Sequence, residues 1–178
     1  MNIKQLRSYV IKQILPPVQN FYAALMQTGQ NWSRSWGDDG MYQKGVNIWG
    51  GRFTDNGDGT ITDSLTGLMW VRDPWSVFSW QMNWYDAINN CENLDYAGYQ
   101  DWRLPNIREL ESLINYAYCN PCIDSMWFWN IQQNWYWAST VYQPYDYYAW
   151  YVYFGDGQRS YAPRDSSYNY VLPVRGGQ

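Results

Sequence analysis

The spacing of apolar residues predicts three helices. Apolar side chains recur at helical spacing within residues 2–15, and Pro16 and Pro17 end this predicted N-terminal helix. Proline is favoured in a first helical turn, so another helix is predicted to begin at Pro105. A further helix, earlier in the chain, is predicted by an apolar stripe at Trp84, Ala87, Ile88, Cys91 and Leu94. The helix from Pro105 is predicted to bury Ile107, Leu110, Leu113 and Ile114.

Extended segments are predicted on both sides of the two central helices. Residues 52–63 contain Asn-Gly-Asp-Gly between two short β-prone runs, which predicts a hairpin, and a second turn leads into a strand at 68–71. From Trp135 onward the apolar period changes to two, which is typical of strands. Residues 155–157 are predicted to form a hairpin turn, and residues 170–174 the last strand.

The period of two divides the C-terminal strands into an inward and an outward face. Tyr151 and Tyr153 are predicted to point outward. The inward, scaffold side is predicted to consist of Trp135, Trp137, Trp150, Val152, Phe154 and Leu172. Two helices packed on antiparallel sheets with long loops define the predicted fold class, α+β.

The length of 178 residues fits one domain with a short extension. We predict an N-terminal helix or extension at 1–26 and a folded domain at 27–178. Residues 27–50 are rich in Gly, Asn, Ser and Asp, which predicts a loop.

The chain is unusually aromatic, with 13 Trp and 18 Tyr. Both side chains combine a large apolar ring with one polar group, which suits interfaces. The net charge of −4 and the lack of a basic stripe argue against a nucleic-acid partner. Apolar runs are short, so no membrane insertion is expected. Lys4, Arg7 and Lys12 interrupt the stretch in which a classical signal peptide would have its apolar core.

The sequence contains no histidine, which removes Ser-His-Asp and Cys-His catalysis and most zinc ligand sets. Cys91, Cys119 and Cys122 are too few for a zinc site, and they are interpreted as a disulfide or as buried thiols. Glu109 and Glu111 lie two apart on a helix and diverge, which predicts a solvated face.

Three aspartates near the predicted hairpin, Asp55, Asp58 and Asp63, invite a calcium site but lack the spacing of an EF-hand loop. Turn chemistry explains the same residues. We therefore predict no metal site, no cofactor and no catalytic residue.

Several long strings occur in a fixed order over residues 27–178. They include RFTDNGDGTITDSLTGLMW at 52–70, AGYQDWRLPNIRELESL at 97–113, and the shorter YWAST, AWYVYF and PVRGGQ near the C-terminus. These strings closely resemble the Legionella collagen-like adhesin C-terminal domain family. The resemblance implies a C-type lectin-like fold. It also implies a place among adhesin domains and the variable proteins of diversity-generating retroelements, some of which lie on viral tail fibres.

The retroelement subset makes a prediction about codons. Such a system randomises adenines in AAY codons, which never yield Lys, Glu, Gln, Met or Trp. From Tyr136 to the end there is no Lys, Glu or Met, and ten of the eighteen tyrosines lie between 136 and 170. The alternative is that sheets favour Tyr and turns favour Asp and Ser. The outward placement of Tyr151 and Tyr153 favours a variable binding region at about 136–170.

Outward tyrosines on a rigid sheet resemble an antibody paratope, in which Ser, Asp and Asn add adaptable hydrogen bonds. We predict that fifteen residues line one exposed face and contact a ligand: Tyr145, Asp146, Tyr147, Tyr148, Tyr151, Tyr153, Asp156, Arg159, Ser160, Tyr161, Arg164, Asp165, Ser166, Ser167 and Tyr168.

Three functions follow from these observations. The first is a diversified ligand- or receptor-binding module, on a viral tail-fibre tip or as a surface receptor. The second is a glycan-binding adhesin of fixed specificity. The third is an enzyme, because formylglycine-generating enzymes share the implied fold and use a cysteine pair, but Cys119 and Cys122 lie in a different motif. We predict a non-enzymatic protein. It would bind a protein or glycan on a cell or host surface, and it would itself lie on a virion or cell surface. The sequence leaves the oligomeric state open; a homo-trimer fits adhesins and fibre tips by analogy.

Overall fold

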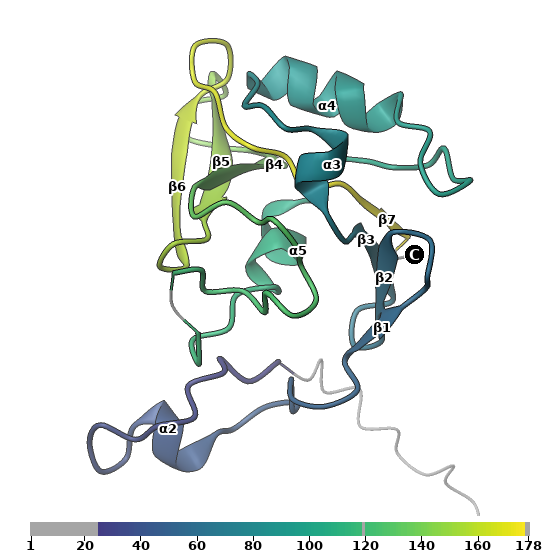
Figure 1. Ribbon diagram of the computed structural model, residues 1–178. Helices are drawn as coiled ribbons and strands as arrows, with labels where there is room; N and C mark the ends of the chain where they lie inside the picture. Colours follow the sequence, from purple (N-terminus) through teal and green to yellow (C-terminus); the bar gives the residue numbers. More distant parts are fainter. Residues whose placement is uncertain (1–24, 119, 177–178) are drawn as a thin grey trace, which may run out of the picture.

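Two antiparallel β-sheets and two main helices organise the chain in the computed structural model, which describes residues 25–118 and 120–176 (Figure 1). One sheet has four strands in the order β1-β2-β3-β7 and the other has the order β4-β5-β6. The strands of the first sheet are β1 (Phe53–Asp55), β2 (Thr60–Asp63), β3 (Leu68–Val71) and β7 (Val174–Gly176). Those of the second are β4 (Trp135–Val141), β5 (Tyr148–Tyr153) and β6 (Gln158–Pro163). The α+β prediction is confirmed; the predicted helix at 2–15 lies outside the described residues.

The predicted hairpin at 52–63 is confirmed as β1 and β2, and its aspartates do the turn chemistry expected of them. Asp55 accepts a hydrogen bond from the backbone N–H of Gly57 at 3.0 Å. Asp58 accepts from the N–H of Thr60 at 3.0 Å and from its hydroxyl at 2.6 Å. These contacts form local Asx turns, which hold the reversal between the two strands.

Asp63 makes a turn contact too, because its Oδ1 accepts from the N–H of Leu65 at 3.0 Å. It has a second role as well, because it is fully buried beside Arg52. The two side chains form a bidentate pair, with Nε to Oδ1 at 3.1 Å and Nη2 to Oδ2 at 2.7 Å. Arg52 is 5% exposed and Asp63 is 0% exposed. Nη2 also donates to the carbonyl of Ser112 at 3.0 Å. The pair therefore fixes the hairpin against the residue that follows helix α5 (Ile107–Glu111).

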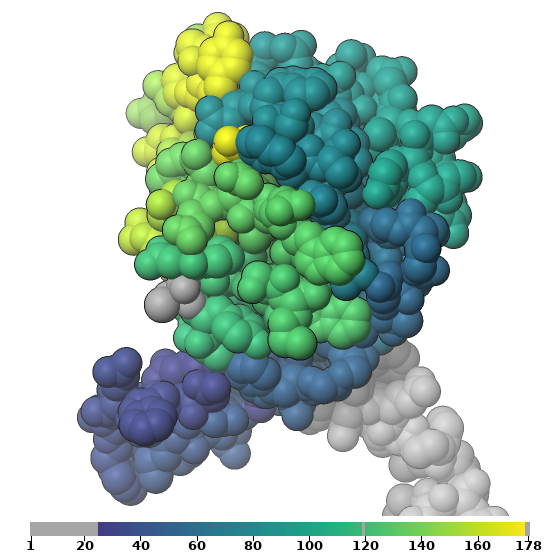
Figure 2. All heavy atoms as spheres, viewed as in Figure 1, coloured from purple at the N-terminus to yellow at the C-terminus, as the bar shows by residue number. Residues whose placement is uncertain are grey.

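The two main helices begin at asparagine caps. Asn83 caps α4 (Trp84–Glu92), and Asn106 caps α5 in a capping box with Glu109. The helix predicted from Pro105 was placed too early, because Pro105 precedes the Asn106 cap and Ile107 is the first helical residue. Two short helices, α2 (Asp39–Tyr42) and α3 (Pro74–Val77), were not predicted. Helix α2 lies in the predicted loop at 27–50, within a lobe that projects from the sheets (Figures 1 and 2).

The expected solvated face at Glu109 and Glu111 is wrong for Glu109. Its carboxylate accepts two hydrogen bonds from Arg103, both at 2.7 Å, and a third from the N–H of Asn106 at 2.8 Å. The Glu109 carboxylate thus completes the capping box and also forms an ion pair with Arg103. Glu111 is paired as well, with Arg108 at 3.3 Å on its own helix and with Arg159 of β6 at 2.7 Å.

The β4-β5-β6 sheet is buried on both faces near its centre. One face joins the larger core cluster through Tyr136, Val152 and Phe154, and α5 packs on that side. The other face joins a second cluster through Trp137 and Ala149, and α4 packs there. Because both faces are covered, apolar residues occupy neighbouring positions of β4 and the expected alternation of inward and outward side chains fails.

The two helices meet this sheet at a β-bulge in β4. The register shifts between Trp137 and Val141, where β4 has more residues than β5. At the bulge, the indole Nε1 of Trp84 donates to the carbonyl of Ala138 at 2.8 Å. The N–H of Ser139 donates to the carbonyl of Pro105 at 2.8 Å. Thus α4 and the segment before α5 are both bonded to the bulge.

The final predicted strand at 170–174 is displaced. Only Val174–Gly176 forms β7, beside β3, whereas Tyr170 makes an isolated parallel bridge to Tyr136. Val171 is buried in the second cluster and Leu172 in the larger one, so neighbouring side chains enter opposite cores. An extended segment that passes between two cores does not have a single inward face.

The two described cysteines are buried. Cys91 is a free thiol in the second cluster, and burial raises its pKa. Cys122 lies in the larger cluster, where its sulfur approaches the carbonyl of Gly155 at 3.6 Å. Cys119 lies outside the described residues. Within the described part of the chain, no helix has the length and hydropathy needed to cross a membrane.

The buried Arg52–Asp63 pair leads to a stability prediction. Asp63→Asn removes one charge and leaves the Arg52 guanidinium buried without its partner. We expect a loss of about 3–5 kcal/mol in the free energy of unfolding, measured by urea denaturation. The control is Arg108→Gln, at a side chain 81% exposed in its ion pair, where we expect a loss below about 1 kcal/mol. The double variant Arg52→Met/Asp63→Leu should recover most of the loss. Equal stability of Asp63→Asn and Arg108→Gln would contradict a role for the buried pair.

Candidate functional site

A cluster of aromatic rings covers one end of the β4-β5-β6 sheet. We name it the tyrosine platform and define it as Tyr142, Tyr145, Tyr148, Trp150 and Tyr161. Tyr142 and Tyr161 are stacked, with centroids 3.8 Å apart and planes at 9°. Trp150 meets Tyr142 edge-on at 5.2 Å and Tyr161 at 5.8 Å. Tyr148 meets Tyr161 at 5.7 Å and Tyr145 at 6.2 Å.

Strand pairing explains why these rings lie together. Trp150 of β5 is directly opposite Tyr161 of β6, so both side chains project from the same face of the sheet. Further along this face, Val152 and Phe154 enter the larger core, and Trp150 packs against its edge. The same face therefore begins in the core and ends at the surface. Tyr145 is 64% exposed and Tyr161 is 40% exposed.

Arg159 connects the platform to helix α5. Its guanidinium lies 5.4 Å from the centroid of the Trp150 ring, and its Nη1 bonds Glu111 at 2.7 Å. It lies opposite Val152, on the platform face. The ion pair holds β6 against α5, so Arg159 contributes to the order of the platform as well as to its charge.

Two loops beside the platform are tied together by Tyr147 and Asp165. The Tyr147 hydroxyl donates to the Asp165 carboxylate at 2.5 Å. This hydrogen bond raises the pKa of Tyr147 and lowers the pKa of Asp165. The backbone N–H of Arg164 also donates to the carbonyl of Tyr147 at 3.1 Å. The β4–β5 loop and the segment after β6 thus form one joined tip.

The prediction of one exposed face is wrong. Tyr151 and Tyr153 lie on the opposite side of the sheet from Tyr161, where Trp135 meets both of them at 4.5 Å. Ser160 pairs with Tyr151 and shares that side.

The predicted scaffold face is also wrong, because it grouped Trp150 with Trp135 and Trp137. The register places Trp135 and Trp137 opposite Tyr153 and Tyr151, on the far side from Trp150.

None of the fifteen predicted contact residues is buried. The exposed ones are Tyr145, Asp146, Tyr147, Asp156, Arg159, Tyr161, Asp165, Ser166 and Tyr168. The half-buried ones are Tyr148, Tyr151, Tyr153, Ser160, Arg164 and Ser167. Strand pairing and the joined loops bring most of them to the platform and the tip, while Tyr151, Tyr153 and Ser160 face the other way.

Sequence reasoning missed four residues at this site. Tyr142 is part of the tyrosine-rich stretch, and its position just after a strand was a usable signal. Trp150 was assigned to the scaffold, but it is half-buried within the platform. Trp84 and Tyr85, at the start of α4, contact the Arg164 guanidinium. No local signal in the sequence connects residues 84 and 85 with residue 164.

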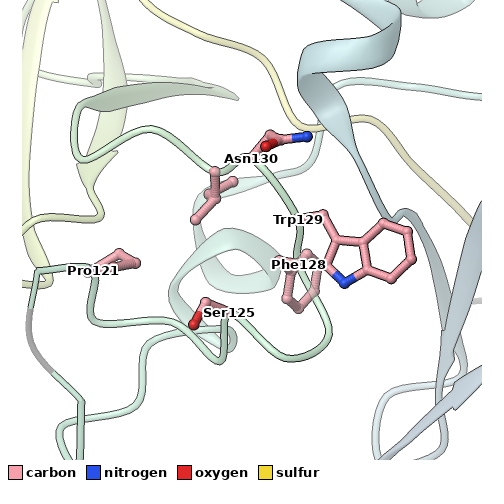
Figure 3. A pocket seen from close by; sticks show the side chains of 6 residues that line it. Pro121, Ser125, Phe128, Trp129 and Asn130 are labelled. Carbon is pink, nitrogen blue, oxygen red and sulfur yellow. The ribbon is translucent and has the colours of Figure 1, made fainter.

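A separate pocket of about 360 Å³ lies in the loop before β4 (Figure 3). Its lining residues are Pro121, Ser125, Phe128, Trp129, Asn130 and Ile131. The Asn130 amide is already bonded to Asp73 at 2.8 Å, and the Trp129 ring stacks on the Arg72 guanidinium at 3.7 Å. These two side chains are engaged in holding the loop, and the described residues that line the pocket include no titratable group.

Across residues 25–118 and 120–176, no three His, Cys, Asp or Glu residues gather as metal ligands would. The architecture and its surface define an α+β domain that carries an exposed aromatic platform on a sheet held between two cores.

The model of the Lcl C-terminal domain family matches residues 59–175, which is more than half of the chain. The chain belongs to this family of adhesin-associated domains. The resemblance to the Legionella collagen-like adhesin C-terminal domain family is therefore confirmed. No curated protein matches the chain. The matched residues include the β4-β5-β6 sheet, the whole platform, and strands β2 and β3 of the other sheet, whereas β1 and the lobe at 25–51 precede them.

The Tyr147–Asp165 bond leads to a prediction about titration. Asp165→Asn removes the carboxylate, so the pKa of Tyr147 should fall toward the ordinary value of about 10. The native bond stabilises the tip above the pKa of an unperturbed aspartate and is lost as pH falls through the lowered pKa of Asp165. It is also lost as pH rises through the raised pKa of Tyr147. NMR titration of the tyrosine ring carbons measures the pKa of Tyr147 in the wild type and in the variant. Asp156→Asn, at an exposed turn aspartate, should leave the pKa of Tyr147 unchanged; a Tyr147 titration unaffected by Asp165→Asn would contradict the bond.

Proposed function

We propose that this domain binds a protein or glycan on a cell or host surface through the tyrosine platform and the joined tip. The observation that carries the proposal is the packing of five exposed or half-buried aromatic rings into one continuous cluster. Tyrosine provides a large contact area with few rotatable bonds, so little entropy is lost when a partner binds. Stacking of Tyr142 on Tyr161 restricts those bonds further before binding.

We propose in addition that a diversity-generating retroelement varies this surface. The platform tyrosines and the exposed Asp and Ser residues of the tip are all compatible with AAY-derived codons. Trp150, which such codons cannot produce, lies among them as a constant contact. Tyr136 and Asn169 are also codon-compatible, but both are buried, and they are therefore expected to be constant. Variation would then act on the exposed subset of residues 136–170.

The remaining parts of the proposal follow from the family. Membership in an adhesin-associated family supports a location on a virion or cell surface and a C-type lectin-like fold. The proposed role is binding without catalysis.

A second candidate is a glycan-binding adhesin of fixed specificity. The family association favours it, and exposed aromatic rings such as Tyr145 and Tyr161 can stack on sugar rings. Residues 52–178 contain seven arginines and fourteen acidic residues, so a sulfated polyanion is a poor partner for this part of the chain.

A pair of libraries tests the first proposal. In the surface library, NNY codons randomise Tyr145, Asp146, Tyr147, Tyr161, Asp165, Ser166 and Tyr168. In the matched core library, the same codons randomise Tyr136, Ala138, Ala149, Val152, Phe154, Val171 and Leu172. We expect most surface variants to stay folded, because exposed substitutions usually change stability by less than about 0.5 kcal/mol. Most core variants should unfold. Protease resistance on display measures this difference.

Selection of the surface library on several unrelated protein targets then tests binding. We expect specific binders to different targets, all of which lose binding when Trp150 is replaced by Ala. If the surface library unfolds as widely as the core library, the proposal of a diversified surface is wrong.

The DNA that flanks the gene provides an independent test. We expect a near-copy of the codons for 136–178 beside a reverse transcriptase gene. Absence of this copy, together with specific glycan binding on an array, would favour the second candidate.

A further inference from the structure

Arg164 differs from the other arginines of residues 52–118 and 120–176, because it has no carboxylate partner in the described chain. The arginines that form ion pairs are Arg52, Arg72, Arg103, Arg108, Arg159 and Arg175. Arg164 instead lies at the tip, inside the surface proposed to bind a partner. Its charge is therefore the one in this part of the chain that no acidic residue of the described structure neutralises.

Aromatic rings hold the Arg164 side chain in place. Its guanidinium carbon lies 5.1 Å from the centroid of the Trp84 ring and 5.2 Å from that of Tyr85. The backbone is fixed on both sides, because the N–H of Trp84 donates to the Arg164 carbonyl at 2.9 Å. The N–H of Arg164 donates to the carbonyl of Tyr147 at 3.1 Å. The start of α4 and the loop after β6 thus lie side by side (Figure 1).

The nitrogen atoms of this guanidinium differ in their access to solvent. Nε is buried without a hydrogen-bond partner, whereas the two terminal nitrogens are not among the buried unpartnered atoms. No described side chain bonds them either. A guanidinium whose orientation is fixed and whose outer N–H groups are free suits two-point recognition of a planar anion. The neighbouring rings exclude part of the water, which strengthens such a contact.

We propose that Arg164 binds a carboxylate of the partner, and that it is the residue of this surface that selects an acidic group. The inference rests on the proposed binding function and adds the chemistry of one contact. The exposed ring of Tyr85, which contacts the guanidinium, provides an apolar wall for the group that carries the carboxylate.

The surrounding charges favour a single carboxylate over a polyanion. Asp165 is the next residue, Asp86 lies in the first turn of α4, and Asp146 belongs to the joined loop. A partner that presents several negative charges would be repelled by these carboxylates. An isolated Asp, Glu or C-terminal carboxylate of a protein, or a single sugar acid, would meet Arg164 without that repulsion.

Arginine side-chain NMR tests the site with acetate as the probe. The Nε–Hε signals of the labelled full chain are followed as sodium acetate replaces sodium chloride at constant ionic strength. We expect the Arg164 signal to shift in a saturable way and to move further than that of Arg108, which is exposed and already paired. Neutral acetamide should move neither signal. Arg164→Gln identifies the signal by removing it, and Arg34→Gln, which has the same charge change in the lobe, should leave the acetate response intact. An Arg164 signal that acetate does not move, or moves no further than that of Arg108, overturns the proposal.

A displayed random-peptide library separates this inference from the proposed function. Peptides selected on the wild-type domain should be enriched in Asp, Glu or free C-termini, and Arg164→Gln should weaken them about tenfold or more, as expected for a charge-assisted hydrogen bond. Arg34→Gln should leave their affinity unchanged. If peptides bind the platform and lose affinity with Tyr161→Ala but not with Arg164→Gln, the carboxylate assignment fails while the binding function stands. If acetate binds at Arg164 but selected peptides are indifferent to Tyr161→Ala, the anion site stands and the proposed function fails.

Discussion

The bulge of β4 is the point on which the arrangement of the domain depends. Its backbone bonds the Trp84 indole of α4 through Ala138 and the segment before α5 through Ser139. These contacts hold one helix on each side of the same three-stranded sheet. A sheet covered on both sides has little freedom to change its register, because a slip of one residue would move side chains from one core into the other. The register of β5 and β6 then places Tyr148, Trp150 and Tyr161 of the platform on one face.

The same constraint explains how a rigid core and an exposed aromatic surface occupy one sheet. Along β5, Val152 is fully buried, whereas Trp150, two residues earlier on the same face, is half-buried and borders solvent. Helix α5 covers only one end of this face. Beyond it the tyrosines pack on each other and on Trp150, so their order comes from ring contacts and from the Arg159–Glu111 pair. A surface built in this way can change residues at its outer positions while its inner contacts remain.

The arginines of the domain differ in how their charges are held. Six arginines of the sheet-containing part are paired with carboxylates, and the most buried pair, Arg52–Asp63, fastens the first hairpin to the end of α5. Such a pair contributes mainly by fixing which elements meet, because desolvation offsets much of its attraction. Arg164 is held by aromatic rings, which orient its charge without neutralising it. The difference between the two environments leaves the Arg164 charge without an ion-pair partner among the described residues.

The sequence alone determined the α+β class, the first hairpin, α4 and the family, because each depends on local periodicity, turn residues or long strings. It misplaced α5 by two residues and the last strand by four, since Pro105 and Tyr170 satisfy local patterns that the tertiary contacts do not use. Only the tertiary structure decided the faces of the second sheet. Alternation along one strand cannot show that both faces are buried, nor that Tyr161 lies opposite Trp150 while Tyr151 lies opposite Trp137. The contact of α4 with Arg164 joins residues far apart in the chain, and no local pattern encodes it.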